Sequence, residues 1–105
     1  MEILTTKSFS TAVSNGISII DFFAPWCGPC RMIAPIFEKL SIEFDGKAKF
    51  YKVDIDQDSK IAADYGVISI PTIIVFSNGS EIDRKVGGMR EIDFRIWMNE
   101  FCNRS

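Results

Sequence analysis

The stretch that decides the fold runs from Ile17 to Phe44 and reads ISIIDFFAPWCGPCRMIAPIFEKLSIEF. Its first eight residues, 17–24, are nearly all β-branched or aromatic, which is typical of a strand covered on both faces in a parallel or mixed sheet. From Cys27 to Phe44 the apolar residues recur every three or four positions, which predicts a long amphipathic helix. Those apolar positions are Met32, Ile33, Ile36, Phe37, Leu40 and Phe44. A strand therefore leads directly into a helix, with two cysteines at the junction.

The rest of the chain continues this alternation of helix-like and strand-like segments. Ser8 is expected to cap a short helix over 9–15, which Gly16 ends. Strands are expected at 48–56, 71–79 and 80–88, the last two joined by an Asn78-Gly79 turn, with helices at 59–66 and 91–102. The last helix should turn Phe94, Trp97, Met98 and Phe101 or Cys102 inward. The resulting order, β-α-β-α-β-α-β-β-α, predicts an α/β fold with a central mixed sheet and helices on both faces.

Length and composition indicate one compact domain over residues 1–105, because 105 residues of which 47% are hydrophobic and 25% charged suit a single core. The net charge of -2 gives no basic surface, so neither nucleic acid nor an anionic membrane is expected as a partner. The first ten residues have no cationic start and no apolar segment, so we expect no signal or transit peptide. A cytoplasmic location is the prediction.

The pair Cys27 and Cys30 has three possible roles. A structural disulfide would close so short a loop that it would add only about 2 kcal/mol in the chain-entropy model. A zinc site usually needs four ligands, but the chain has no histidine and its only other cysteine is Cys102. A reactive pair is favoured, because Cys27 lies where the helix begins and where free N–H groups and the helix dipole stabilise a thiolate. Gly28 permits a tight backbone, and Pro29 fixes the first helical turn.

Asp21 is the one charge in the buried strand. Strand alternation places it on the face that also holds Ile17, Ile19 and Phe23, so its carboxyl group should lie in apolar surroundings. Two ordinary explanations remain open: local hydrogen bonds could satisfy the acid, or it could lie at a wet edge of the sheet. If it is buried, its pKa should be raised, which would make it a usable general base near neutral pH.

Four motifs together resemble the thioredoxin family from the first strand to the last helix. They are FFAPWCGPCRMIAPIFEKL, VDIDQD, YGVISIPTIIVFSNG and KVGG, in that order and at these spacings. The resemblance implies a thioredoxin fold in which Cys27 and Cys30 form a redox-active disulfide. It also implies that Asp21 takes the proton of Cys30 and that Lys52 is the neighbour of this acid. From the sequence alone, Lys52 would pass for an ordinary exposed strand residue.

The resemblance further implies a surface that receives protein substrates. Its residues would be Trp26, Gly28, Pro29, Ile70, Pro71, Val86 and Gly87. By resemblance the Ile70–Pro71 bond is cis, whereas an X–Pro bond at the start of a strand is trans by default. The family usually has Trp where Phe23 stands, which changes the packing under the site. Cys102 lies outside the motifs, and its helical spacing from Phe94 and Met98 indicates a small buried hydrophobe.

The function implied is a protein-disulfide reductase that carries electrons without a cofactor of its own. A flavin-dependent, NADPH-consuming thioredoxin reductase would restore its dithiol, and ribonucleotide reductase, peroxiredoxins and methionine sulfoxide reductases would be targets. The chain is expected to act as a monomer. Two alternatives remain: a disulfide oxidase or isomerase, against which Gly28-Pro29 argues, and a binding module that uses the same apolar surface independently of redox chemistry.

Overall fold

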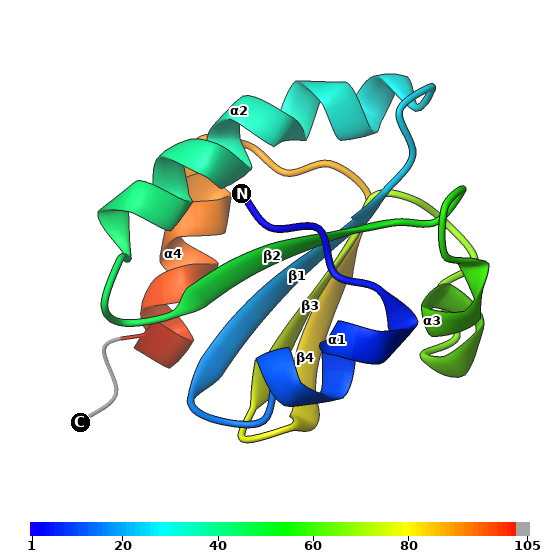
Figure 1. Cartoon of the computed structure of the whole chain (residues 1–105). Coiled ribbons are helices and arrows are strands. Elements are labelled where there is room, and N and C mark those ends of the chain that lie inside the picture. The colour runs from blue at the N-terminus through cyan, green and yellow to red at the C-terminus, as the bar shows by residue number, and fades with distance from the viewer. Residues whose placement is uncertain (103–105) are drawn as a thin grey trace.

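The central sheet has four strands, with helices on both of its faces. A computed structural model describes residues 1–102, and Figure 1 shows the arrangement. The elements are α1 (Thr6–Ala12), β1 (Ile17–Phe23), α2 (Gly28–Glu43), β2 (Lys49–Asp54), α3 (Ser59–Asp64), β3 (Thr72–Ser77), β4 (Ser80–Val86) and α4 (Glu91–Cys102). The strand order is β2-β1-β3-β4; β1 is parallel to β2 and antiparallel to β3, and β3 is antiparallel to β4. The predicted α/β fold with a mixed sheet is confirmed.

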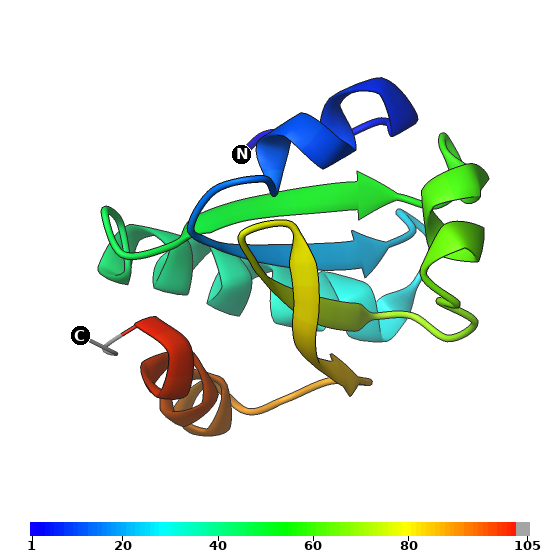
Figure 2. The same ribbon diagram turned by 90° about the horizontal axis from the view of Figure 1, so that it is seen from below.

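Helices cover both faces of the sheet (Figure 2), and an apolar core layer lies on each face. Helices α2 and α4 pack against one face, where Phe37 and Phe94 meet Ile19 of β1. Helices α1 and α3 contribute Phe9 and Ile61 to the other layer, which also contains Ile20 and Phe22. Strand β1 is therefore buried on both faces, as its continuous apolar pattern predicts.

The N-terminal segment differs from its prediction. Helix α1 begins at Thr6 rather than after Ser8, and Ser8 lies in the first turn, where its Oγ accepts a hydrogen bond from the Thr5 N–H (2.9 Å). The strand expected before this helix is reduced to an isolated parallel bridge between Ile3 and Lys52. Because the helix starts so early, the chain leaves the edge of β2 after that bridge.

Met32 is also placed differently from its prediction. It was counted with the apolar face of α2, but its side chain is 78% exposed, whereas Ile33, Phe37 and Leu40 are buried. A helix turns by about 100° per residue, so the position before Ile33 lies well outside a stripe centred on these three side chains.

The β3–β4 hairpin forms one edge of the sheet. Asn78 and Gly79 have φ values of 49° and 88°, the left-handed conformation that a two-residue hairpin turn requires at both positions. The predicted Asn-Gly turn is therefore confirmed. Among residues 1–102, strand β4 pairs only with β3, and it carries the charged residues Glu81, Asp83, Arg84 and Lys85.

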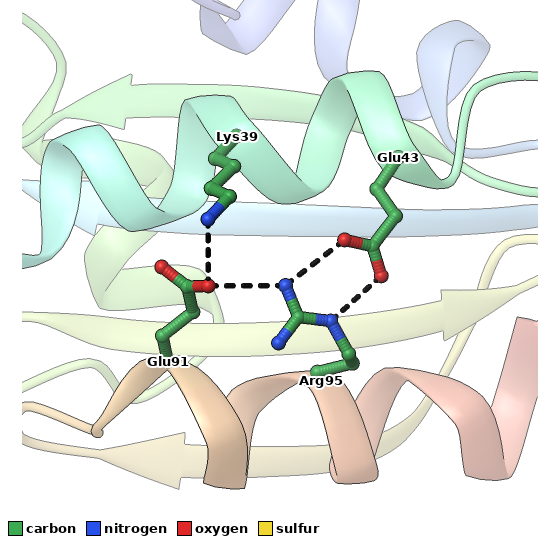
Figure 3. A network of polar contacts seen from close by, with 4 residues as sticks. All are labelled: Lys39, Glu43, Glu91 and Arg95. Carbon is green, nitrogen blue, oxygen red and sulfur yellow. Dashed lines mark hydrogen bonds and ion pairs between the residues drawn. The ribbon is translucent and has the colours of Figure 1, made fainter.

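A polar network joins α2 to α4 (Figure 3). Arg95 donates to both carboxylate oxygens of Glu43 (2.8 and 2.9 Å) and to Glu91 (3.1 Å), which also accepts from Lys39 Nζ (2.9 Å). The Arg95 guanidinium lowers the pKa of Glu43 below its ordinary value. Because the pair is bidentate and partly covered, the network fixes how the second half of α2 lies on α4.

Within residues 1–102, no helix is both long enough and apolar enough to span a bilayer.

Replacing Phe37 tests the packing of α2. Its fully buried ring has its centroid 5.3 Å from that of Phe50 and 6.0 Å from that of Phe94. Phe37→Ala should therefore lower the free energy of unfolding by about 3–5 kcal/mol, measured by urea denaturation. The matched control is Met32→Ala on the exposed side of the same helix, which should change it by less than about 0.5 kcal/mol. Equal losses in the two variants would contradict this account of the core.

Candidate functional site

Cys27 and Cys30 meet where β1 passes into α2. They form a disulfide with a Cα–Cα distance of 5.2 Å, inside the usual range. Cys27 is the N-cap of α2, followed by Gly28 and Pro29 in the first turn, where a missing proline N–H costs no helical hydrogen bond. The Sγ of Cys27 accepts a hydrogen bond from the backbone N–H of Cys30 (3.2 Å). One sulfur thus occupies the capping position that a Ser or Asp oxygen often fills.

The position of Cys27 has an electrostatic consequence for the reduced protein. A sulfur at the N-cap lies at the positive end of the helix dipole and next to a free N–H donor. Both effects favour the thiolate form of Cys27 over the thiol. Cys30, inside the first turn, has the dipole but not the capping position. The geometry therefore distinguishes the two sulfurs, because only Cys27 occupies the capping position.

Exposure does not distinguish the two cysteines. Cys27 is 5% exposed and Cys30 is 3% exposed, so both are nearly covered. They form a small apolar cluster with Ala24, against which Phe23 and Ile70 pack. The difference between the two cysteines therefore lies in their positions on the helix.

The loop before β3 brings a second segment to Cys27. The Sγ of Cys27 lies 3.9 Å from the carbonyl oxygen of Ile70, and the Ile70–Pro71 bond is cis, as the family resemblance implies. Gly87, with a φ of 94°, donates its N–H to the Pro71 carbonyl (2.8 Å), which holds the end of β4 against this loop. The preceding side chain, Val86, is 63% exposed. Ile70, Pro71, Val86 and Gly87 thus reach one region from two separate segments.

Trp26 extends that region on the other side of Cys27. Its side chain is 66% exposed, and its Nε1 donates a hydrogen bond to Oδ2 of Asp56 (2.8 Å), just after β2. Asp56 was not predicted as a site residue, and its only sequence signal is its place in the acidic VDIDQD motif. The bond fixes the orientation of a large ring that would otherwise turn freely in solvent.

Asp21 is completely buried in the central strand. Burial raises the pKa of its carboxyl group to about 6, and the nearby positive charge of Lys52 opposes that rise. Among residues 1–102, neither carboxylate oxygen has a hydrogen-bond partner. The two ordinary explanations therefore fail, because the acid is not satisfied locally and β1 is not an edge strand. The predicted burial and the predicted direction of the pKa shift are confirmed.

Lys52 is the direct neighbour of Asp21 across the β1–β2 pair. The two Cα atoms are partners in the parallel register. The ammonium group of Lys52 lies 4.4 Å from the centroid of the Phe23 ring, two residues beyond Asp21 on β1. The structure thus brings Lys52 to Asp21 as the resemblance implied, and it adds Phe23 to the group, which the sequence had treated only as a packing change.

Two other features lie apart from this site. Cys102 is only partly buried where it packs against the α2–α4 core layer, so the prediction of a buried residue is only partly correct; its burial raises the pKa of the thiol. A hollow of about 810 Å³ is lined by residues such as Ile42, Lys47 and Phe50 and by none of the predicted site residues. Within residues 1–102, no cluster of three or more metal-ligating side chains occurs.

Comparison with known proteins gives a consistent result. The family model described as thioredoxin matches residues 1–100. A thioredoxin of Staphylococcus epidermidis is 46% identical over 84 residues, which covers 80% of this chain and 81% of the relative. A thioredoxin of Staphylococcus aureus matches with the same identity and the same coverage.

Burial of Asp21 predicts a pH-dependent stability of definite sign. A carboxyl group whose pKa rises from 3.8 to about 6 on folding stabilises the fold fully below its unfolded pKa and loses that contribution as pH rises through the folded value. Asp21→Asn removes this titration. Relative to the variant, the wild type should therefore lose roughly 2 kcal/mol of unfolding free energy between about pH 4 and pH 7. Urea denaturation of both proteins across this range measures the difference, and a constant difference would mean that Asp21 ionises normally in the fold.

Proposed function

Since the chain belongs to the thioredoxin family, we propose that it reduces disulfide bonds of other proteins by dithiol–disulfide exchange through Cys27 and Cys30. One observation carries the proposal: the Cys27 sulfur caps α2, accepts the Cys30 N–H and faces the Ile70 carbonyl. That arrangement favours a thiolate beside a backbone segment that can pair with an extended substrate chain.

The reaction proceeds in two exchanges. The Cys27 thiolate attacks one sulfur of the target disulfide, a mixed disulfide forms, and the second target sulfur leaves as a thiolate that takes up a proton. Cys30 then loses its proton, attacks the Cys27 sulfur and releases the first target sulfur. Two electrons pass to the target, and the Cys27–Cys30 disulfide is the product.

Asp21 is the proton acceptor for Cys30 in this proposal. A carboxyl group with a pKa of about 6 is mostly ionised at neutral pH, so it can accept a proton from a thiol and later release that proton to solvent. Lys52 supports the ionised form by its charge. Both residues lie on the face of β1 and β2 that α2 covers, since they share it with Ile19 and Phe50.

The target would bind on the surface around Cys27. Trp26, Val86 and Ile70 supply apolar contact, while Gly28, Pro29 and Gly87 leave room for a partner backbone next to the sulfur. We assign Pro71 a supporting role, because its carbonyl holds Gly87 and its ring lies next to Ile70. Such a surface accepts many sequences, so we propose ribonucleotide reductase, peroxiredoxins and methionine sulfoxide reductases as target classes.

The cellular setting follows from the chemistry. A disulfide reductase ends each cycle oxidised, so its Cys27–Cys30 disulfide must be reduced again. We propose an NADPH-dependent thioredoxin reductase as the electron donor and the reducing cytoplasm as the location. The chain would work as a monomeric single domain over residues 1–105, because target and recharging enzyme would use the same surface in turn. The second candidate is a redox-independent binding module, favoured by the exposure of Trp26 and Val86.

A coupled assay tests the reductase. With NADPH, thioredoxin reductase and insulin, the wild type should turn over continuously, whereas Cys30→Ser should stop after one exchange, because no second sulfur can release the target. Mass spectrometry should then find insulin attached to Cys27. Cys102→Ser is the matched control and should keep wild-type turnover. Full turnover by Cys30→Ser would remove the second exchange from the mechanism.

The binding module makes a different prediction for a variant that lacks both reactive sulfurs. With Cys27→Ser and Cys30→Ser combined, a reductase should show only background insulin reduction, and cells that depend on the wild type should not be rescued. A binding module would rescue those cells fully with this variant.

A further inference from the structure

Asp21, Phe23 and Lys52 lie on the same face of the β1–β2 pair. Asp21 and Phe23 are two residues apart on β1, so they point to the same side, and Lys52 shares that side with Phe50 on β2. Asp21 and Lys52 are partners in the register. A lysine in this position can extend toward the carboxylate or along the strands toward their carboxyl ends.

In the structure Lys52 extends toward the carboxyl ends of the strands. Its Nζ lies over the ring of Phe23, 4.4 Å from the centroid, while both oxygens of Asp21 remain without a hydrogen-bond partner among the described residues. Phe23 also packs against the cluster of Ala24, Cys27 and Cys30. The ring thus lies next to the reactive disulfide and also holds the cation.

We propose that Phe23 is a positioning residue whose ring holds the Lys52 ammonium beside the Asp21 carboxyl group rather than on it. A partly desolvated ammonium over an aromatic face is attracted by the ring quadrupole. A direct ion pair with Asp21 would fix that acid in its ionised form and weaken it as a proton acceptor. The ring therefore competes with the carboxylate for one cation and leaves Asp21 free to exchange its proton.

Other charges around Asp21 are few, which makes the competition measurable. Strands β1 and β3 carry no other titratable side chain, and Ile73 of β3 lies opposite Asp21. Helix α4 contributes Phe94, Trp97 and Met98 to this face, and α2 contributes Cys30, which does not titrate while it is in the disulfide. On β2, Asp54 is also buried and pairs with Phe23 in the register, where its Oδ1 accepts the Asp56 N–H, but the charge that acts on Asp21 is Lys52. The effect of the ring on Asp21 therefore passes through Lys52.

The effect on thiol exchange rests on the proposed function, but the position of Lys52 does not. The experiment therefore uses the oxidised protein and needs no activity: the Asp21 carboxyl carbon is followed by NMR during a pH titration, with Asp21→Asn to assign the signal. Phe23→Leu should lower the midpoint by about half a pKa unit, the size expected for an ordinary cation–π contact. Phe23→Trp, which keeps an aromatic face, should leave it within about 0.2 units.

The decisive arm removes the cation. Lys52→Met should raise the Asp21 midpoint, and adding Phe23→Leu to Lys52→Met should then change it no further. If Phe23→Leu lowers the midpoint equally in both backgrounds, the ring acts by excluding water. If it raises the midpoint, the ring does not hold the cation away from Asp21. Either result overturns the proposal. If Phe23→Leu does not fold, Phe23→pentafluorophenylalanine keeps the shape and removes the negative ring face. It should lower the midpoint in the same direction, and an unchanged midpoint would equally overturn the proposal.

A kinetic arm separates this proposal from the proposed function. In a reductase, the pH midpoint of insulin reduction should move with the Asp21 midpoint in Phe23→Leu. An inactive wild type would refute the reductase and leave the titration result standing. An active wild type with an unmoved Asp21 midpoint would refute the role of Phe23 alone.

Discussion

The complete enclosure of β1 is the constraint on which the site depends. This strand is hydrogen-bonded along both edges and covered on both faces. Its carboxyl end therefore has a fixed position, and the short loop after it sets Cys27 at the beginning of α2. The same enclosure keeps water away from Asp21. The position of the Cys27 sulfur at the helix start and the raised pKa of Asp21 thus both result from the same packing of β1.

Much of the fold could be predicted because it depends on local chemistry. The continuous apolar run of β1, the helix beginning at Cys27 and the Asn78-Gly79 turn each follow from residues close together in the chain. The errors arose where local signals compete. Thr5 and Ser8 both suit a helix start, and only packing decides between them. Met32 fits a loose count of apolar spacings, yet it lies outside the stripe that the sheet buries.

The candidate site divides in the same way. Asp21 could be predicted as buried because it is the single acid in an apolar strand. The contacts of Lys52 with Phe23 and of Trp26 with Asp56 could not, because each joins residues about thirty positions apart and depends on the register of parallel strands. The cis bond before Pro71 had no local signal, and only the family resemblance indicated it.

The two edges of the sheet have a consequence for self-association. An open strand edge can recruit another copy of the same chain and start aggregation. At one edge, the bridge from Ile3 to Lys52 occupies part of β2. At the other, β4 carries two acids followed by two bases, so like charges would face one another if an identical strand paired with it in parallel register. The bridge at one edge and the charges at the other therefore both oppose edge-to-edge pairing of two copies of the sheet.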